Sequence, residues 1–374
     1  AQRNNAWMSQ DQQHIYAAQP SMKHILLVDD CMELYLFRHS TWEQRYSCDY
    51  LTEDEWNVKR ITRVPHGVFS IIFATVALML YIPCMMILRR QQFMQNTCYK
   101  IMFYLGIVDI VSQLLDGFLN GYLLIVGAVF CNYPHFIYLS GTFVFAIWCV
   151  QCGLCSLLAL NRFIDTCIGK DVTETLFEGY RTHIWCMACF SYGTVMVFVS
   201  PSLIFTSTGG SWFYDPYIGY DNVTQVDRSW YFNKMMGINN IGIVFVLVFL
   251  YTGMLIKIMI QSRRGGVTFQ KAIFCQAAFI CLLNAVPALI YLYMQFCSAP
   301  EWLIAVGHFA WQGSNGGPAF IYIFFNKTIQ RNVLAMVGMK RGSSTAVSTL
   351  KPSGAGGSRF SQATISAHHS HSKY

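Results

Sequence analysis

Long apolar stretches alternate with short polar segments along most of the chain. A helix needs about 20 mostly apolar residues to cross the hydrocarbon core of a bilayer, which is roughly 30 Å thick. Six stretches reach this length without any Asp, Glu, Lys or Arg: 67–88, 136–160, 184–205, 235–256, 272–296 and 302–325. A seventh, residues 101–127, contains two carboxylates and is otherwise apolar. Because backbone polar groups must be satisfied inside lipid, the pattern predicts an all-α membrane protein, a seven-transmembrane helix bundle over residues 66–325.

Basic residues are distributed unevenly over the loops. The loops after helices one, three and five, with the helix ends beside them, hold ten Lys and Arg residues: Arg89, Arg90, Lys100, Arg162, Lys170, Arg181, Lys257, Arg263, Arg264 and Lys271. The loops after helices two, four and six hold only Arg228 and Lys234. By the positive-inside rule the first set is cytoplasmic, so the N-terminus is predicted to lie outside. The net charge of +7 therefore favours membrane topology over nucleic-acid binding.

The flanking segments have their own composition. Residues 1–65 have mixed charge and are predicted to form an extracellular N-terminal region. Residues 326–339 place apolar side chains on one face, which predicts a short amphipathic helix on the inner membrane surface. Residues 340–374 are rich in Gly, Ser and His, which predicts a disordered cytoplasmic tail. Asn222 begins an Asn-Val-Thr sequon in the second outer loop, so we expect it to be glycosylated.

A polar stripe follows the second helix. Asp109, Gln113, Asp116 and Asn120 recur at steps of four, three and four residues, which places them on one helix face. Polar side chains are unfavourable in lipid, so this face should look into the bundle. The stripe predicts a hydrated core that rearranges on activation, and the alternative is an interhelical network that only packs.

Three other helices carry polar residues that match this stripe. His308, Gln312 and Asn315 form a similar face on helix seven, and Asn284 lies in helix six. Residues 161–165 close helix three with the sequence NRFID.

In that closing segment Asn161 precedes Arg162, and the spacing allows an ion pair between Arg162 and Asp165 one turn later. Taken alone, Arg162 is an ordinary positive-inside arginine.

Cysteine and catalytic motifs give a more limited picture. Four of the 14 cysteines lie on the outer side, where pairing is expected: Cys31, Cys48, Cys131 and Cys297. We favour Cys48 with Cys131, although the sequence leaves the other pairings open. The chain has no phosphate-binding glycine loop, no H-E-x-x-H and no nucleophile elbow, so we expect no enzyme.

Several of these features together resemble the rhodopsin-like receptor superfamily. Leu105 and Asp109 are similar to its helix-two motif, whose aspartate binds sodium there, and residues 161–163 stand where its Asp/Glu-Arg-Tyr motif lies. Residues 318–322 resemble its helix-seven Asn-Pro-x-x-Tyr motif, without the asparagine. The chain lacks a cysteine in outer loop two, so the usual disulfide of that superfamily cannot form.

A closer resemblance is to the nematode serpentine chemoreceptors of class t. It is carried by residues 80–84 (LYIPC), 98–103 (CYKIMF), 158–162 (LALNR), 177–182 (FEGYRT) and 212–216 (WFYDP), and by the segment 307–319. The resemblance implies a G-protein-coupled receptor for a small environmental chemical or pheromone. It also implies a heterotrimeric G protein as partner and a location in the plasma membrane of a sensory-neuron cilium.

This reading assigns roles to the polar residues. Asp116, Asn120, Gln113, His308, Gln312 and Asn284 are expected to form the ligand pocket or the polar core, with Asp109 as a sodium ligand and no other cofactor. Arg162, Asn161 and Asp165 are expected to form the G-protein switch, with Tyr251 and Tyr322 as partners. The alternative function is a seven-helix ion channel or transporter that uses the acidic stripe of helix two.

Overall fold

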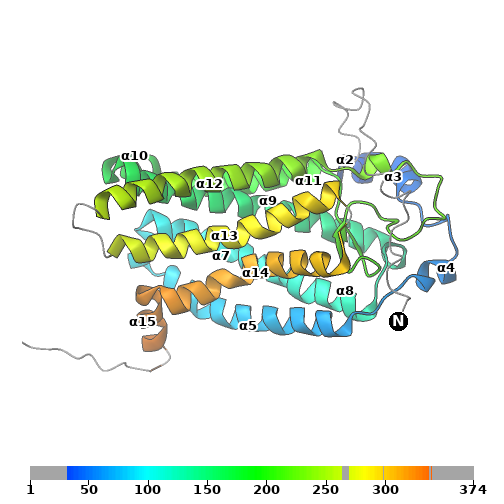
Figure 1. Ribbon diagram of the computed structural model, residues 1–374, viewed down its shortest axis with the longest axis horizontal. Helices are drawn as coiled ribbons and strands as arrows, with labels where there is room; N and C mark the ends of the chain where they lie inside the picture. The colour runs from blue at the N-terminus through cyan, green and yellow to red at the C-terminus, as the bar shows by residue number, and fades with distance from the viewer. Residues whose placement is uncertain (1–31, 263–268, 298, 337, 339–374) are drawn as a thin grey trace, which may run out of the picture.

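The computed structural model describes residues 32–262, 269–297, 299–336 and 338. Its long helices run side by side along one axis (Figure 1). The short helices α2, α3 and α4 lie at one end of this bundle, and the short helices α10 and α15 lie at the other. The first end is the one that the distribution of basic residues predicts to be extracellular, and we call it the outer end.

The long helices correspond to the seven apolar stretches of the sequence. Their bounds are α5 (Val64–Leu88), α7 (Thr97–Ser112) continued by η2 (Gln113–Leu119) and α8 (Asn120–Val126), α9 (Pro134–Phe163) continued by η4 (Ile164–Ile168), α11 (Arg181–Val199), α12 (Lys234–Ser262), α13 (Phe269–Phe296) and α14 (Glu301–Phe325). Helix α9 packs against α7, α11 and α12, and α14 packs against α5 and α13. The all-α bundle predicted from the sequence is therefore confirmed.

Length and composition alone identify five of these segments as candidate membrane spans within the described part of the chain: residues 64–88, 97–126, 134–168, 181–199 and 228–261. In α13 the apolar helix found is shorter, Leu282–Met294. Helix α14 has the length of a span, 25 residues. It also carries buried polar side chains, among them His308, Gln312 and Asn315, which lower its mean hydropathy.

The fourth helix ends earlier than its apolar stretch predicts. We expect a helix through residue 205, but α11 ends at Val199. Ser200 has an extended backbone (φ −130°, ψ 140°), because a residue before proline is disfavoured in the helical region and Pro201 follows. The chain then forms β1 (Ile204–Thr206), which pairs with β2 (Ser211–Phe213) as an antiparallel hairpin. The apolar residues after Pro201 belong to this hairpin, which the sequence analysis does not predict.

The second helix is α-helical only at its two ends. Its middle, η2, is a π-helix of seven residues between α7 and α8. π-helical turns are rare in proteins as a whole, and those that occur are often found at functional sites. Asp116 lies inside η2, Asp109 before it and Asn120 directly after it. The widened turn therefore occurs in the middle of the polar stripe.

The outer end is covered by three short helices that the sequence analysis does not predict: α2 (Met32–Phe37), α3 (His39–Arg45) and α4 (Glu53–Val58). The side chain of Thr52 caps α4 by accepting a hydrogen bond from the backbone N–H of Glu55. A disulfide joins Cys48 to Cys131, directly before α9. These helices therefore form a folded cap on the bundle.

At the opposite end two short helices lie beside the bundle (Figure 1). Helix α10 spans Lys170–Phe177, and α15 spans Lys327–Met336. Ile329 and Val333 of α15 are buried, and α15 packs against α5 and α14. The amphipathic helix predicted after helix seven is therefore present. Residues 1–31 and the predicted tail 340–374 lie outside the described residues.

Candidate functional site

An apolar cavity lies in the outer half of the bundle. It encloses about 320 Å³ of unfilled space, including the part that opens to solvent. Its lining comes from α9, the hairpin segment, α12, α13 and α14 and consists of Val144, Phe145, Trp148, Leu203, Trp212, Met236, Tyr291 and Trp311. The cavity is a candidate site for a small ligand held between four helices and the second outer loop.

Trp311 connects this cavity to a polar layer in α14. Its side chain lines the cavity, and its ring centroid is 6.3 Å from that of His308. Its backbone carbonyl accepts a hydrogen bond of 3.2 Å from the side-chain amide of Asn315. A change in the position of Trp311 would therefore also shift His308 and Asn315 in the polar layer.

The polar stripe of the second helix faces this layer, as its spacing predicts. Asp109 accepts hydrogen bonds from the hydroxyl of Tyr81 at 2.6 Å and from Nε2 of Gln151 at 3.2 Å. The same hydroxyl lies 2.9 Å from the carbonyl oxygen of Asn315. Asp116 accepts from Nδ2 of Asn315 at 2.5 Å. The two carboxylates are therefore bound by three different helices.

The rest of the stripe contacts α14, which in turn is hydrogen-bonded to α5. Nε2 of Gln113 donates to the carbonyl of Gln312 at 3.0 Å. Nδ2 of Asn120 lies 2.9 Å from Nε2 of His308. Ser70 of α5 donates to Oε1 of Gln312 at 3.1 Å, and Nε2 of Gln312 donates to the carbonyl of Ser70 at 2.8 Å. All of these side chains are buried, and we call this network the polar core.

The polar core contains buried polar atoms that have no hydrogen-bond partner among the described residues. They are the amide or carboxylate oxygens of Gln113 (Oε1), Asp116 (Oδ1), Asn120 (Oδ1), Gln151 (Oε1) and Asn315 (Oδ1), together with Nδ1 of His308 and the nearby hydroxyl of Ser112. Uncharged or negative oxygen ligands are what hard cations bind. The residues present therefore fit a cation such as sodium, with Asp109 or Asp116 supplying the charge.

The polar core and the cavity are separate places. Asp116, Asn120, Gln113, His308 and Gln312 belong to the polar core, and none of them lines the cavity. Asn284 is also fully buried and absent from the cavity lining. Their predicted role in the ligand pocket or the polar core stays a prediction.

Arg162 lies at the cytoplasmic end of α9 within a short chain of contacts. Its Nη1 is 3.6 Å from Oδ2 of Asp165, which is the ion pair that the spacing allows. Its Nη2 donates to Oδ1 of Asn161 at 3.0 Å. Nδ2 of Asn161 in turn donates to Oγ1 of Thr97, the first residue of α7, at 3.1 Å. Through Asn161, the end of helix three that carries Arg162 is thus connected to the start of α7 in helix two.

The two tyrosines predicted to act with Arg162 differ in burial. Tyr322 of α14 is fully buried, and its hydroxyl has no hydrogen-bond partner in the described part of the chain. Tyr251 of α12 is partly buried and packs against the hydrophobic core.

Phe163, beside Arg162, would lie 2.7 Å from a Cβ at Gly253 of α12. The end of α9 therefore packs closely on α12.

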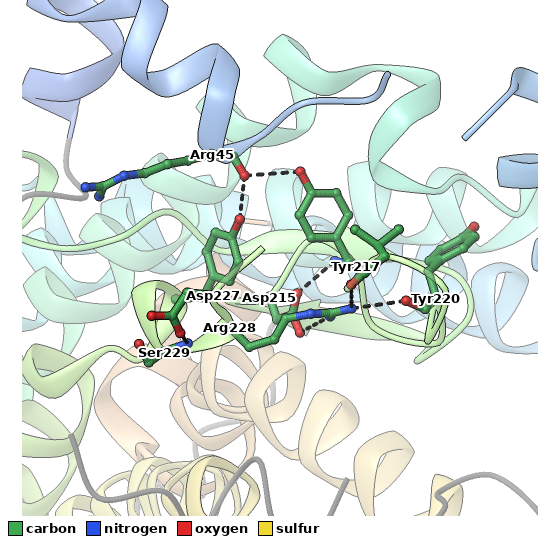
Figure 2. Close-up of polar contacts among 9 residues, drawn as sticks. Arg45, Asp215, Tyr217, Tyr220, Asp227, Arg228 and Ser229 are labelled. Atoms are coloured by element: carbon green, nitrogen blue, oxygen red, sulfur yellow. Dashed lines mark hydrogen bonds and ion pairs between the residues drawn. The ribbon is translucent and has the colours of Figure 1, made fainter. Parts of the chain in front are cut away.

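The second outer loop closes the cavity from outside and is itself pinned in place. Arg228 forms an ion pair of 2.5 Å with Asp215 and donates to the carbonyl of Tyr220 at 3.1 Å, as Figure 2 shows. Burial of the Asp215 carboxyl raises its pKa, and the Arg228 guanidinium opposes that rise. The hydroxyl of Tyr217 donates to the carbonyl of Arg45 in the cap at 3.1 Å. The loop is therefore fixed to the cap above it.

A second set of contacts holds the hairpin turn. Nη1 of Arg63, directly before α5, lies 3.3 Å from Oε2 of Glu301 at the start of α14. Its Nε and Nη2 donate to the carbonyls of Ser207 and Thr208, each at 3.3 Å. Asn222 is exposed in the same loop, so its side chain is accessible, and its glycosylation stays a prediction.

The comparisons with known proteins agree with this arrangement. The family model described as "Serpentine type 7TM GPCR chemoreceptor Srt" matches residues 32–346. The chain belongs to this family. The Srt chemoreceptors are receptors and not enzymes, so no catalytic motif is expected in this sequence.

One relative and one solved structure illustrate the likeness. Serpentine receptor class T-55 of Caenorhabditis elegans is 22% identical to this Srt chain over 300 residues, which is 79% of this chain and 81% of that protein. The crystal structure of squid rhodopsin matches with a TM-score of 0.54 at 12% identity and covers 73% of this chain and 85% of its own. The fold is therefore that of the rhodopsin-like receptors, and the protein is a multi-pass membrane protein.

Most of the cavity lining cannot be recognised from the sequence. The lining residues are apolar or aromatic side chains in segments that are largely apolar, so little contrast with their neighbours marks them. No feature of the sequence singles out Tyr291, but this residue lines the cavity and its hydroxyl lies 3.3 Å from Oγ of Ser211 in the hairpin. Only the fold of loop two brings these two residues together.

Proposed function

We propose that this Srt protein is a chemosensory receptor that binds a small molecule in the outer cavity and activates a heterotrimeric G protein. The observation that carries the proposal is the position of Trp311, which lines the cavity and contacts the polar core through His308 and Asn315. A ligand that favours one position of Trp311 would shift the population of the bundle between two states.

The proposed signal reaches the cytoplasmic end through helices that the polar core joins. Asp109 and Asp116 link the second helix to α5, α9 and α14. The cytoplasmic end of that helix contacts Asn161, which contacts Arg162. In this proposal the Arg162–Asp165 ion pair opens on activation and frees Arg162 for the G protein, with Tyr251 and Tyr322 beside it. The sensory-neuron cilium is the proposed location.

Substitution of Arg162 tests the proposal. Arg162→Ala should reduce ligand-stimulated nucleotide exchange on a co-reconstituted G protein at equal surface expression. Arg89→Ala is the matched control, because Arg89 is an exposed arginine directly after α5 and should leave exchange unchanged. Undiminished exchange in Arg162→Ala would refute the switch role.

The alternative, an ion channel or transporter, gains no support from a particular contact. An ion path along the second helix would need its polar stripe to line a passage. The stripe is instead bound to α5, α9 and α14 within the polar core, and the described cavity is apolar.

A further inference from the structure

Helix α10 carries an exposed apolar pair at the cytoplasmic end of the bundle. Val172 and Leu176 are about one turn apart and therefore share a face, and each is 39% exposed. Thr173 and Phe177, the next residue in each case, lie on the adjoining face and are buried, where α10 packs against η4 and α11. The apolar side of α10 is therefore wider than the part that the bundle covers.

The rest of α10 is polar, so the helix is amphipathic. Its other four residues are exposed: Lys170, Asp171, Glu174 and Thr175. A helix with one polar and one apolar side can lie in the plane of a membrane interface, with its apolar side toward the acyl chains. Helix α15 has a similar pattern, but its Ile329 and Val333 are buried where it packs against α5 and α14. Helix α10, in contrast, keeps Val172 and Leu176 exposed.

Helix α11 fixes the orientation of α10. The last carbonyl groups of a helix have no partner within that helix, and in α10 side chains of α11 donate to them. Nε1 of Trp185 donates to the carbonyl of Leu176 at 3.1 Å. Nη1 of Arg181 donates to the carbonyl of Thr175. The protein therefore holds the exposed pair in one direction.

Trp185 also indicates the depth of α10. It lies about one turn inside the cytoplasmic end of the candidate membrane span Arg181–Val199, most of which is exposed, and it is itself 46% exposed. Tryptophan is enriched where headgroups meet acyl chains. In Figure 1 α10 lies at the level of the last turns of α12 and not beyond the ends of the long helices. The hydrogen bond from Trp185 to Leu176 therefore makes the exposed pair a continuation of the lipid-facing surface of α11.

We propose that α10 lies in the interface of the inner leaflet, with Val172 and Leu176 against the acyl chains and its polar side toward the cytoplasm. The proposal goes beyond the proposed function, because it needs neither a ligand nor a G protein. Since α10 follows η4, which continues α9, this contact would hold the end of α9 that carries Arg162 at a constant depth in the membrane.

The other occupant of such a pair would be a protein partner. A protein-binding surface has no need to continue the lipid-facing side of α11 or to lie at the level of Trp185. Both observations favour the bilayer, so lipid is the occupant that we infer.

Fluorescence quenching tests the proposal on the full chain in nanodiscs of phosphatidylcholine and phosphatidylserine, without ligand or G protein. A fluorescent amino acid replaces Leu176 in one variant and Val172 in another, so no cysteine has to be labelled. The control variant carries it at Thr175, the exposed polar neighbour of Leu176. Each variant is measured with lipids brominated in the acyl chains, which quench on contact, and with iodide, which quenches from water.

The expected result is a severalfold greater loss of fluorescence to brominated lipid at positions 172 and 176 than at position 175, and the reverse order with iodide. The physical reason is depth, because the apolar side of an interfacial helix lies about 5–10 Å inside the boundary between headgroups and acyl chains.

Iodide quenching at positions 172 and 176 equal to that at 175 would overturn the proposal. Absence of quenching by either agent would also overturn it, because the pair would then be covered by protein. If a G-protein heterotrimer, added after iodide had reached both positions, protected them, the pair would be a protein-binding surface instead. The two labelled positions are separate variants, so one decides where the other does not fold. The assay is independent of the Arg162 test, so failure of either leaves the other standing.

Discussion

Asp109 lies where three helices meet in the polar core. Its carboxylate accepts hydrogen bonds from Tyr81 of α5 and Gln151 of α9 and is completely buried. Asp116 lies on the same helix face, bound by Asn315. Its Oδ1 and the amide oxygens of Gln113, Asn120, Gln151 and Asn315 lack hydrogen-bond partners among the described residues. A cation would supply charge to the carboxylates and coordination to those oxygens. We therefore propose that sodium binds here, with Asp109 as a ligand.

The sodium proposal predicts an ion-specific stabilisation. Replacing choline chloride with sodium chloride at equal ionic strength should raise the midpoint of thermal unfolding by roughly 2 °C or more, because a ligand of the folded state contributes about 1 kcal/mol at a few times its Kd. Asp109→Asn should abolish the difference between the two salts. The control is Asp54→Asn, at an exposed aspartate of α4, which should keep it. An undiminished sodium effect in Asp109→Asn would show that the ion binds elsewhere.

Residues of the polar core differ in how well the sequence reveals them. Asp109, Gln113, Asp116 and Asn120 are predictable, because polar residues at helical spacing stand out in an apolar helix. Tyr81, a single tyrosine in α5, has no such pattern and looks like packing. Its hydroxyl nevertheless bridges Asp109 and the backbone of Asn315. Its role depends on which helices are neighbours, and this information is not local in the sequence.

Among the elements, the β1–β2 hairpin is the one that completes the cavity, since it carries Trp212 and follows Leu203. Its position depends on close approach to α9. A Cβ at Gly141 would lie 1.5 Å from the carbonyl oxygen of Leu203 and 2.5 Å from its carbonyl carbon. Only glycine allows this backbone contact, so the hairpin sits against the helix where a side chain is absent.

The close contact predicts that Gly141→Ala destabilises the receptor. The new methyl group would displace backbone and not a flexible side chain, so we expect a loss of about 1–3 kcal/mol or more in the free energy of unfolding, read as a lower thermal midpoint. Gly242→Ala in α12 is the matched control, because nothing lies within 4 Å of a Cβ there and alanine favours a helix over glycine. Equal midpoints for the two variants would mean that the hairpin does not need this contact.

The ends of the membrane helices match the ends of the apolar stretches in the sequence, except where a proline or a loop ends a helix early. The long helices are predictable because about 20 apolar residues in a row have few other stable arrangements. The end of α11 is not, because Leu203, Ile204 and Phe205 are apolar and suit either a continued helix or a strand. Pro201 is the local signal that separates the two, whereas the pairing of Phe205 with Trp212 is non-local.

For the whole molecule, the cap and the second outer loop act as one lid over the bundle. Tyr217 and Tyr220 of the loop donate to backbone carbonyls of Arg45 and Trp56 in the cap. Arg63 joins the hairpin turn to Glu301 at the start of α14. These contacts link the second outer loop to the cap and to the outer ends of helices one and seven, so the lid orders the outer end as a single unit.

The Cys48–Cys131 disulfide is the one covalent link within the described part of this lid, and it closes a loop with a sequence separation of 83 residues. Reducing the freedom of so long a loop in the unfolded chain is worth about 3–5 kcal/mol. Cys48→Ser and Cys131→Ser should therefore each lower the thermal midpoint, and the double variant should be no less stable than either single one, because both substitutions remove the same bond. Cys297→Ser, at an exposed free cysteine, is the control and should leave the midpoint unchanged.

Additive losses in the double variant would contradict the pairing, because they would mean that the two cysteines stabilise the fold separately. If the pairing holds, the cap is held to the top of α9, whose residues Val144 and Trp148 line the cavity.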